Sequence, residues 1–270
     1  MISTVKVAAV QMNSLPYDKA GNLALAEGLV RQAAEAGAKL VVLPELFNTG
    51  YQVADQDYAL SEPVAGGETV RWMEELSARH QLYLVAAIIE RSACDGVLYD
   101  TCVLTGPEGY VGKYRKVCLW GAESLRFRSG HEYPVFDLGF ARLGMQICYE
   151  VGFPEGARIL TLNGANLLAY SAAFGRRRSY VWELASRARA LENGLYVVAA
   201  NRSGAEDEES VFAAKSRIVD PTGAVLEETE AENGIIVTEI DLDRVPVQRM
   251  TVPYLRDYKQ QLFANGIGGV

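Results

Sequence analysis

Residues 142–155, RLGMQICYEVGFPE, decide how the rest of the chain is interpreted. Their first part is apolar and ends at Cys148, which is typical of a buried strand, and a Pro-Glu pair suited to the first turn of a helix follows six residues later. The sequence therefore predicts a strand that ends in a corner at Cys148 and a helix that begins at Pro154.

The corner at Cys148 suits a nucleophile, because its side chain stands out from the backbone and the amides that follow can face a developing oxyanion. Free cysteine is also among the most buried residue types, so a structural thiol fits the local pattern equally well. A reactive thiol needs an activating partner. The choice between the two interpretations therefore depends on the rest of the chain.

Two other predicted strands end in charged residues. The apolar run at 41–43 leads through a proline into Glu45, and Lys116 follows a strand-like segment that ends in Tyr-Arg. Amide hydrolysis needs a nucleophile, a group that takes and returns a proton, and a positive charge near the carbonyl oxygen. Cys148, Glu45 and Lys116 offer one group for each task. Taken singly, Glu45 and Lys116 would be interpreted as solvated surface residues.

A histidine base is the main alternative to Glu45. The chain holds two histidines, His80 and His131. His80 ends a predicted surface helix and His131 follows a Ser-Gly turn, so neither is well placed to reach Cys148 at hydrogen-bond distance. A carboxylate at the end of a buried strand is partly desolvated and binds protons more readily than one in water. The pattern therefore favours Glu45.

The composition limits the class of partner. A chain of 270 residues with 49% hydrophobic content can bury the core of one domain. A formal net charge of -8 and a pI near 5.0 argue against nucleic acid and anionic membranes as partners, because both call for a basic surface. The N-terminus lacks the pattern of a signal peptide, and no apolar run approaches the ~20 residues of a membrane helix. We expect a cytoplasmic protein with a small-molecule substrate.

Cysteine and histidine usage argues against a metal or cofactor. The four cysteines have no C-x-x-C spacing, and two histidines offer little for a zinc site. Disulfides are rare in the reducing cytosol. We expect free thiols, no metal and no organic cofactor. Three of the thiols are given no part in the chemistry: Cys94, Cys102 and Cys118.

Hydrophobic periodicity predicts an α/β protein with a mixed sheet. Strand, helix and strand at 5–11, 22–37 and 39–43 form a βαβ unit, which places a helix on the face of a sheet. The predicted strands that follow lie at 83–90, 98–105, 110–116, 142–149, 166–174, 196–200, 215–219, 224–227 and 235–242. The predicted helices that follow lie at 68–80, 154–164 and 177–194, the first with a core face of Val70, Met73 and Leu76 and the last with an apolar face of Tyr180, Val181, Leu184, Ala188 and Leu191.

Three further segments carry charge or lack a period. The acidic run at 206–209 is interpreted as a solvated face, since charge runs usually are. The arginine run at 176–178 is interpreted as a helix start or a subunit contact, with an anionic substrate as the alternative. From about residue 244 the chain shows no clean period, which indicates an arm.

The order of Glu45, Lys116 and Cys148, each with its flanking residues, resembles the carbon-nitrogen hydrolase (nitrilase) superfamily. The resemblance implies a four-layer α-β-β-α sandwich with mixed sheets, paired into a homodimer or a higher homo-oligomer. It places the hydrolase domain at 1–243 and a C-terminal arm, expected in a subunit contact, at 244–270.

The resemblance also implies roles for other residues. Glu123, in the spacing Glu-x-x-x-Phe-x-x-Gly, is similar to a second family glutamate that positions Lys116 and the substrate nitrogen. Lys116 and the backbone amide of Tyr149 would form the oxyanion hole. Cys118 stands where many members carry histidine, which puts the anchoring of the nearby loop in doubt. The residues expected to contact substrate are Tyr51, Trp120, Glu150 and Phe174.

The expected reaction is hydrolysis of a small carboxamide to a carboxylic acid and ammonia through a thioester on Cys148. Nitrilases usually follow the cysteine with Trp-Glu, whereas Tyr149 and Glu150 resemble the amidase branches. Val151 and Gly152 stand where branches with carboxylate-bearing substrates carry arginine, so a neutral or cationic amide is favoured.

The alternatives within the family are an N-carbamoyl amine or amino acid amidohydrolase and a nitrilase. Two alternatives belong to other classes of protein. A scaffold protein without catalytic activity is one, and the complete triad argues against it. A nucleotide-binding protein is the other, but the first strand is not followed by a glycine-rich loop.

Overall fold

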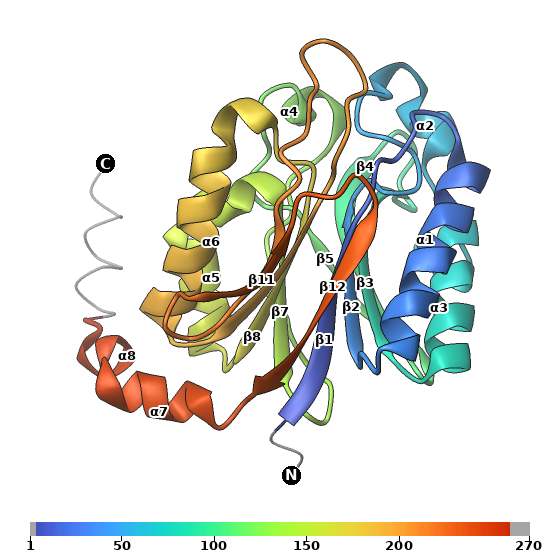
Figure 1. The fold of residues 1–270 in the computed structure, drawn as a ribbon. Helices are drawn as coiled ribbons and strands as arrows, with labels where there is room; N and C mark the ends of the chain where they lie inside the picture. Colours follow the sequence, from blue (N-terminus) through green and yellow to red (C-terminus); the bar gives the residue numbers. More distant parts are fainter. Residues whose placement is uncertain (1–3, 260–270) are drawn as a thin grey trace, which may run out of the picture.

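The computed structural model describes residues 4–259 as two six-stranded mixed sheets packed face to face, with helices on their outer faces. Figure 1 shows the four layers, with α1 and α3 outside one sheet and α5 and α6 outside the other. The four-layer sandwich expected from the sequence is therefore confirmed.

The first sheet combines three parallel strands with antiparallel neighbours. β1, β2 and β3 run parallel at its centre, and β12, β4 and β5 are added antiparallel. Its order is β12 (Gly234–Asp241), β1 (Thr4–Gln11), β2 (Leu40–Glu45), β3 (Tyr83–Arg91), β4 (Leu98–Gly106) and β5 (Gly109–Arg115). The parallel strands direct Glu45, the last residue of β2, to one end of the sandwich.

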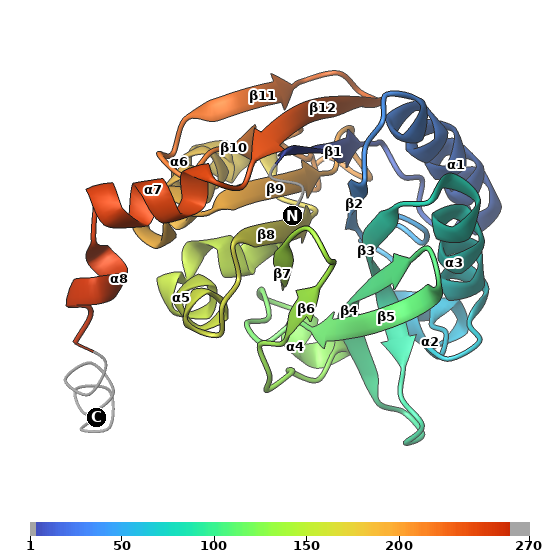
Figure 2. The same ribbon diagram turned by 90° about the horizontal axis from the view of Figure 1, so that it is seen from below.

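The second sheet repeats this arrangement. β7, β8 and β9 run parallel, with antiparallel strands outside them. Its order is β11 (Val225–Thr229), β10 (Ser216–Val219), β9 (Tyr196–Asn201), β8 (Leu167–Ala172), β7 (Arg142–Ile147) and β6 (Val135–Asp137). Figure 2, seen from below, shows the two sheets facing each other. Because β7 ends at Ile147, Cys148 is the first residue beyond the strand.

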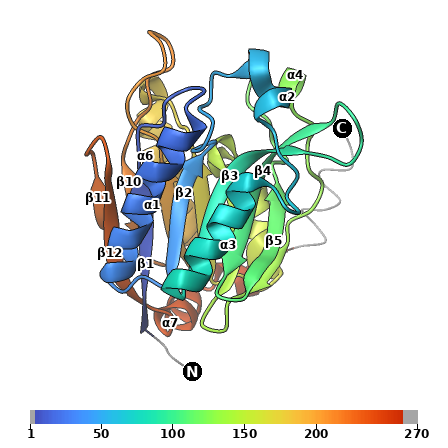
Figure 3. The ribbon, with the colours of Figure 1, turned by 90° about the vertical axis from the view of Figure 1, so that its right-hand side faces the viewer.

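Four helices cover the sheets, and shorter ones lie at their ends. Figure 3 shows α1 and α3 side by side on the first sheet. The long helices are α1 (Lys19–Glu35), α3 (Glu68–His80), α5 (Pro154–Leu162) and α6 (Ser179–Asn193). The short ones are α2 (Asp57–Leu60), α4 (Glu123–Arg126), α7 (Arg244–Thr251) and α8 (Tyr254–Asp257), with 3-10 turns at Ala54–Gln56, Cys148–Gly152 and Arg176–Arg178.

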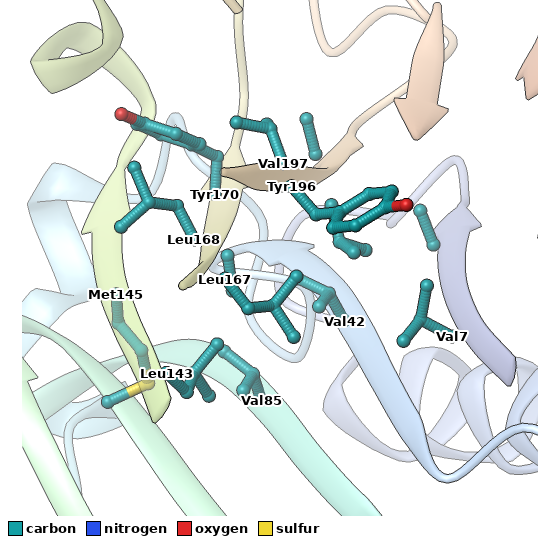
Figure 4. Packing of buried hydrophobic residues seen from close by; sticks show 14 of the residues in the cluster. Val7, Val42, Val85, Leu143, Met145, Leu167, Leu168, Tyr170, Tyr196 and Val197 are labelled. Atoms are coloured by element: carbon teal, nitrogen blue, oxygen red, sulfur yellow. The ribbon is translucent and has the colours of Figure 1, made fainter. Parts of the chain in front are cut away.

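Alternation along each central strand builds two hydrophobic layers. Successive side chains of a strand point to opposite faces of the sheet. Val7 and Val42 accordingly pack between the sheets, whereas Ala8 and Val41 pack under the helices. Figure 4 shows the layer between the sheets, with Val7, Val42 and Val85 on the strands of one sheet and Leu143 and Leu167 on those of the other. This layer fixes the two sheets against each other.

The buried side of α6 is not its apolar side. Tyr180 and Leu184 are both 69% exposed, whereas Trp182 and Arg189 are buried against the sheet. The indole of Trp182 donates a hydrogen bond to the backbone oxygen of Lys215 at 2.9 Å. Of the apolar residues predicted to share a face, Tyr180, Leu184 and Leu191 are exposed, whereas Val181 and Ala188 are half-buried and Val181 packs against the core. On α3, by contrast, the predicted core face is buried, as its residues Val70, Met73 and Leu76 show.

The segment after residue 243 is helical where the sequence predicted an irregular arm. It forms α7 and α8, which leave the sandwich beside α5 (Figure 2). Arg249 on α7 donates to the backbone oxygens of Asn193 and Ala165 at 3.1 and 2.8 Å, and Val245 is buried. The proposed domain boundary at 243 and 244 stays a prediction, and its last residues lie outside the described range. No helix between residues 4 and 259 is long and apolar enough to cross a membrane.

Candidate active site

The corner at Cys148 is held in an unusual backbone conformation. Cys148 follows β7 directly and has φ +48°, in the left-handed region that residues other than glycine rarely adopt. Such conformations persist where the surrounding structure fixes them, and they occur often at active sites. The strand and the corner predicted from the sequence are both present.

The carboxylate of Glu150 holds the corner at Cys148 in place. It accepts hydrogen bonds from the amides of Ile147 at 2.8 Å, Val117 at 2.9 Å and Cys118 at 3.1 Å, and from the hydroxyl of Tyr114. Glu150 is fully buried and ties the segment after Lys116 to the cysteine corner. The substrate contact expected for Glu150 is replaced by this anchoring. The loop at Cys118 is held through its backbone amide, so this anchoring does not depend on the side chain at position 118.

Glu45, Lys116 and Cys148 meet where the ends of the two sheets come together. The ammonium nitrogen of Lys116 lies 2.6 Å from Glu45 Oε1, and neither side chain is exposed. The other oxygen of Glu45 accepts the amide of Ala173 at 2.8 Å. The thiol of Cys148 is buried close enough to Glu45 and Lys116 for the charges of both to act on it. The first sheet thus supplies the carboxylate and the ammonium, and the second sheet supplies the thiol.

Glu123 is the second carboxylate on Lys116. It accepts a hydrogen bond from the Lys116 ammonium at 2.8 Å and from the backbone amide of Trp120 at 2.8 Å. The hydroxyl of Tyr51 donates to it at 2.5 Å. Glu123 therefore links Lys116 to two of the residues expected to contact substrate.

The charges of these groups follow from burial and from their neighbours. Burial raises the pKa of the Glu45 carboxyl, but the charge of Lys116 and the hydrogen bonds around it outweigh burial, so its pKa is lowered. Burial lowers the pKa of Lys116, but the surrounding carboxyl groups raise it well above its ordinary value. Burial and the Glu45 charge together raise the pKa of Cys148 well above that of a free thiol. The resting site holds a neutral thiol beside a carboxylate that can take its proton.

A cavity of about 320 Å³ opens onto Cys148. Tyr51, Trp120 and Phe174, three of the four residues expected to contact substrate, line it, as does Tyr149. The rings of Trp120 and Tyr149 pack edge to face at 4.8 Å. The thiol of Cys148 therefore faces a space whose wall includes five aromatic rings, those of Tyr51, Trp120, Tyr149, Phe174 and Phe212.

Two charged residues on the cavity wall were not predicted as site residues. Arg178 lines the cavity and its guanidinium lies over the ring of Trp120 at 4.4 Å, and Glu209 lines the same cavity. The run at 176–178 therefore contributes one side chain to the pocket, while the exposed Arg176 and Arg177 do not line it. Its position just after a strand that ends near Cys148 was the available signal.

The acidic run at 206–209 is only partly a solvated face. The carboxylate of Glu206 is buried, pairs with the guanidinium of the fully buried Arg202 and accepts the amides of Tyr51 and Gln52 at 2.8 and 2.7 Å. The interpretation of this run as solvated is wrong for Glu206, because one buried guanidinium needs a counter-charge. Glu206 thereby fixes the loop that carries Glu209 against the loop that carries Tyr51.

Asp100 is the third carboxyl group beside Lys116 and was also missed. It lies on β4, is 1% exposed, and its Oδ2 is 3.3 Å from the Lys116 ammonium. A single acidic residue within the apolar segment Leu98–Gly106 was a usable signal. Oxygens of Glu45, Asp100 and Glu123 lie within 4.8 Å of one another, a spacing that suits a metal ion. The ammonium of Lys116 contacts all three, so a resident metal does not fit there.

Comparison with known proteins places this geometry in context. Residues 6–249 match the carbon-nitrogen hydrolase family. The chain is 41% identical over 256 residues to a nitrilase of Pyrococcus abyssi, covering 91% of this chain and 93% of that protein. It is 34% identical over 276 residues to an omega-amidase of Mus musculus, covering 97% of this chain and 98% of that protein.

Solved structures agree on the fold. Nit3 of Saccharomyces cerevisiae, a member of branch 10 of the nitrilase superfamily, has a TM-score of 0.88 at 28% identity, covering 96% of this chain and 97% of that chain. A variant of the amidase from Nesterenkonia sp. AN1, which shows acrylamide added to its active-site cysteine, has a TM-score of 0.86 at 28% identity. In that comparison 97% of this chain and 99% of that chain are covered.

Proposed function

Because the chain belongs to the carbon-nitrogen hydrolase family, we propose that it hydrolyses a small carboxamide to a carboxylic acid and ammonia, with Cys148 as nucleophile. The observation that carries the proposal is the buried pair of Glu45 and the Lys116 ammonium, 2.6 Å apart, whose charges both act on the thiol of Cys148 at the cavity wall. The oxyanion hole is assigned to Lys116 and the amide of Tyr149. Glu123 is assigned to positioning Lys116.

In the proposed cycle the sulfur of Cys148 attacks the amide carbon while Glu45 takes the thiol proton. The oxyanion that forms is stabilised by Lys116 and the Tyr149 amide. Glu45 then gives the proton to the leaving nitrogen, and ammonia departs as the C–N bond breaks. Water activated by Glu45 attacks the thioester, which releases the carboxylic acid and restores the thiol. Every proton taken by Glu45 is returned within one turnover, so no cofactor enters the cycle.

The test is ammonia release from a panel of short amides, N-carbamoyl compounds and nitriles. We expect amides to be hydrolysed and Cys148→Ala to abolish turnover. Mass spectrometry of quenched wild-type reactions should find an acyl adduct on the peptide containing Cys148. Full activity in Cys148→Ala would refute the mechanism, and turnover of nitriles alone would favour a nitrilase.

A second candidate substrate class carries a carboxylate far from the amide, as an amide of a dicarboxylic acid or an N-carbamoyl amino acid does. The observation that favours it is Arg178, whose guanidinium faces the cavity and makes a ring contact with Trp120 but no ion pair among the described residues. Glu209 on the same wall favours a cationic end instead. If the carboxylate class is right, Arg178→Gln should raise KM for acidic amides at least tenfold and leave neutral amides unchanged. Glu209→Gln is the matched control.

Two properties expected from the sequence remain predictions. The outward apolar face of α6, with Leu191 40% exposed beside Tyr180 and Leu184, supports a homodimer or a higher homo-oligomer. The free state of all four cysteines is compatible with the cytoplasmic location that we expect.

A further inference from the structure

Three buried carboxyl groups share one ammonium in the site. Lys116 Nζ lies 2.6 Å from Glu45, 2.8 Å from Glu123 and 3.3 Å from Asp100. None of these four residues is more than 2% exposed. If all three carboxyl groups were ionised, the cluster would hold two buried negative charges in excess. Buried charges without partners are strongly disfavoured.

The hydrogen bonds separate Asp100 from the other two carboxyl groups. Glu45 accepts from Lys116 and the amide of Ala173, and Glu123 accepts from Lys116, a hydroxyl and an amide. Neither carboxylate oxygen of Asp100 accepts a hydrogen bond from any described residue. An ionised carboxylate offers only acceptors, whereas a carboxylic acid has one O–H to donate. The surroundings of Asp100 therefore suit the acid.

The neighbours of Asp100 show where that O–H can go. The titratable and charged groups that act on it or feel its charge are Glu45 from β2, Lys116 after β5, Glu123 and Arg126 from α4, and Cys102 from β4 itself. Arg126 donates to both oxygens of Asp57 at 2.7 and 2.8 Å. Among the described residues, Lys116 is therefore the cation that pairs with Asp100. Carboxyl oxygens of Asp100 and Glu45 lie within 4.8 Å of each other, and hydrogen bonding between the two groups raises the pKa of Asp100 and lowers that of Glu45. Two carboxyl groups in such contact share one proton.

The pKa directions assign that proton. Burial raises the pKa of Asp100 well above its ordinary value, and the Glu45 charge raises it further. For Glu45, burial is outweighed by Lys116 and by the hydrogen bonds, including the one from Asp100, so its pKa is lowered.

We propose that Asp100 is a positioning residue that stays a neutral carboxylic acid and donates a hydrogen bond to Glu45, aiming the Glu45 carboxylate at the thiol of Cys148. This inference rests on the proposed function, because it assigns to Asp100 a role in orienting the base of that reaction. The proton of Asp100 stays on Asp100 throughout the cycle. Its hydrogen bond keeps Glu45 ionised until Cys148 gives up its proton.

The decisive variant is Asp100→Asn, which keeps the shape, the neutral state and a hydrogen-bond donor. We expect it to retain kcat within about threefold, with both limbs of the pH profile of kcat/KM in place. Asp100→Leu removes the donor. We expect it to lower kcat about 10²-fold with KM unchanged, since a misplaced catalytic group costs on this order. Its acid limb should move to higher pH, because Glu45 loses a hydrogen bond that lowers its pKa.

An ionised Asp100 gives the opposite result. Asparagine would then remove a negative charge beside Glu45 and Lys116, so the pKa of both would fall and both limbs would move to lower pH. That shift, or a loss in Asp100→Asn as large as in Asp100→Leu, would overturn the proposal. Thr101→Val is the matched control on the same strand, because the Thr101 hydroxyl bonds Glu90 and not this cluster. Circular dichroism and thermal melting of each variant would separate misfolding from loss of positioning.

A second readout does not depend on turnover. The infrared difference between wild type and Asp100→Asn at neutral pH should contain the carbonyl stretch of one protonated carboxylic acid. Absence of that band would overturn the inference even in an active enzyme. If the band is present and no amide is hydrolysed, the proposed reaction fails and the assignment of the proton stands.

Discussion

At the scale of single residues, the reactivity of Cys148 is governed by the charge beside it. Its thiol is buried and lies against the ionised Glu45, and both effects raise its pKa. A thiol of this kind is a poor nucleophile toward a general alkylating agent, because the thiolate is the reacting species. In the proposed cycle it becomes a good nucleophile toward a bound amide, because Glu45 removes the proton during attack. Selectivity for substrate over other electrophiles follows from this arrangement.

Replacing Glu45 should therefore have opposite effects on two reactions of the same sulfur. In Glu45→Gln we expect kcat/KM for amides to fall about 10³-fold, because the proton acceptor is lost. The same change removes the charge that raises the pKa of Cys148, so the thiolate fraction at a given alkaline pH rises. Alkylation of Cys148 by iodoacetamide at pH 8, followed by mass spectrometry, should be at least as fast as in wild type.

The exposed Cys94 also alkylates, so Cys148→Ala provides the background for that measurement. Slower alkylation in Glu45→Gln would contradict the charge effect, and unchanged hydrolysis would contradict the role of Glu45 as base.

The sequence was informative about residues at the ends of strands and much less so about residues inside them. Glu45 and Cys148 could be singled out because each ends an apolar run where a strand must stop, whereas Lys116 was chosen by its Tyr-Arg-Lys block and by the chain order that resembles the family. Asp100 was passed over because the strand around it was interpreted by its apolar residues alone. Glu150 was placed against substrate by its nearness to Cys148 in sequence. Three of its four hydrogen bonds come from Tyr114, Val117 and Cys118 on another segment, and no local pattern specifies these contacts.

At the scale of elements, the pocket wall depends on one buried ion pair. Arg202, directly after β9, and Glu206 connect the loop carrying Ser210 and Phe212 to the amides of Tyr51 and Gln52. Both charged side chains are at most 1% exposed. Breaking a buried pair by removing one partner leaves an uncompensated charge, which is strongly destabilising. This loop therefore has its position fixed from inside the molecule.

Glu206→Gln tests that anchoring. We expect a loss of about 3 kcal/mol in the free energy of unfolding, because the guanidinium of Arg202 stays buried without its partner. We also expect KM to rise more than kcat falls, because the loop lines the cavity while the catalytic groups lie on other segments. Urea unfolding and steady-state kinetics measure the two effects. Glu208→Gln, at an exposed position of the same run, should change neither, and equal effects in both variants would contradict the assignment.

The central strands were predicted closely because both of their faces are buried, which produces nearly continuous apolar runs, whereas the short edge strand Val135–Asp137 was not predicted. The helix Ser179–Asn193 shows where such reasoning stops. Apolar residues do recur along one side of this helix, as predicted. The repeat does not indicate whether that side packs against the sheet or against another partner. The buried side uses Trp182, whose indole donates to Lys215 on a distant segment, and Ser186 and Asn193, whose side chains donate to backbone oxygens of the same helix.

At the scale of the whole molecule, the outward apolar face of α6 is the strongest candidate for a subunit contact. Tyr180, Leu184 and Leu191 recur at helical spacing along it, and the neighbouring α5 exposes Ile159 and Leu162. Contiguous apolar surface on a folded protein marks interaction sites. We therefore expect a second copy of this chain to cover the helix.

Leu184→Glu tests this prediction. A charge buried in an apolar contact without a partner is strongly unfavourable, so we expect the assembly to dissociate by at least one step. Sedimentation velocity of wild type and variant measures the change. Leu125→Glu, at an 89% exposed leucine on α4, is the matched control and should leave the assembly intact. A monomeric wild type, or dissociation in both variants, would contradict the proposed contact.

The division of strands between two sheets is the part of the fold that residue patterns did not provide. Periodicity supported an α/β chain with a mixed sheet, and the second sheet came from the resemblance of three short segments to a family. The reason is physical, because strand pairing depends on contacts between residues far apart in sequence. Val42 on β2 and Leu167 on β8 pack in the same layer, and neither local sequence predicts that the two strands lie in facing sheets.

Since Glu45 and Lys116 belong to one sheet and Cys148 to the other, the proposed mechanism requires both halves of the molecule, and neither half should hydrolyse an amide alone. A refolding chain recovers ammonia release only after its halves have docked, however early their strands form. The rate at which activity returns during refolding should therefore report the rate at which the two sheets dock. A change that weakens the packing between the two sheets should therefore abolish activity before the chain unfolds.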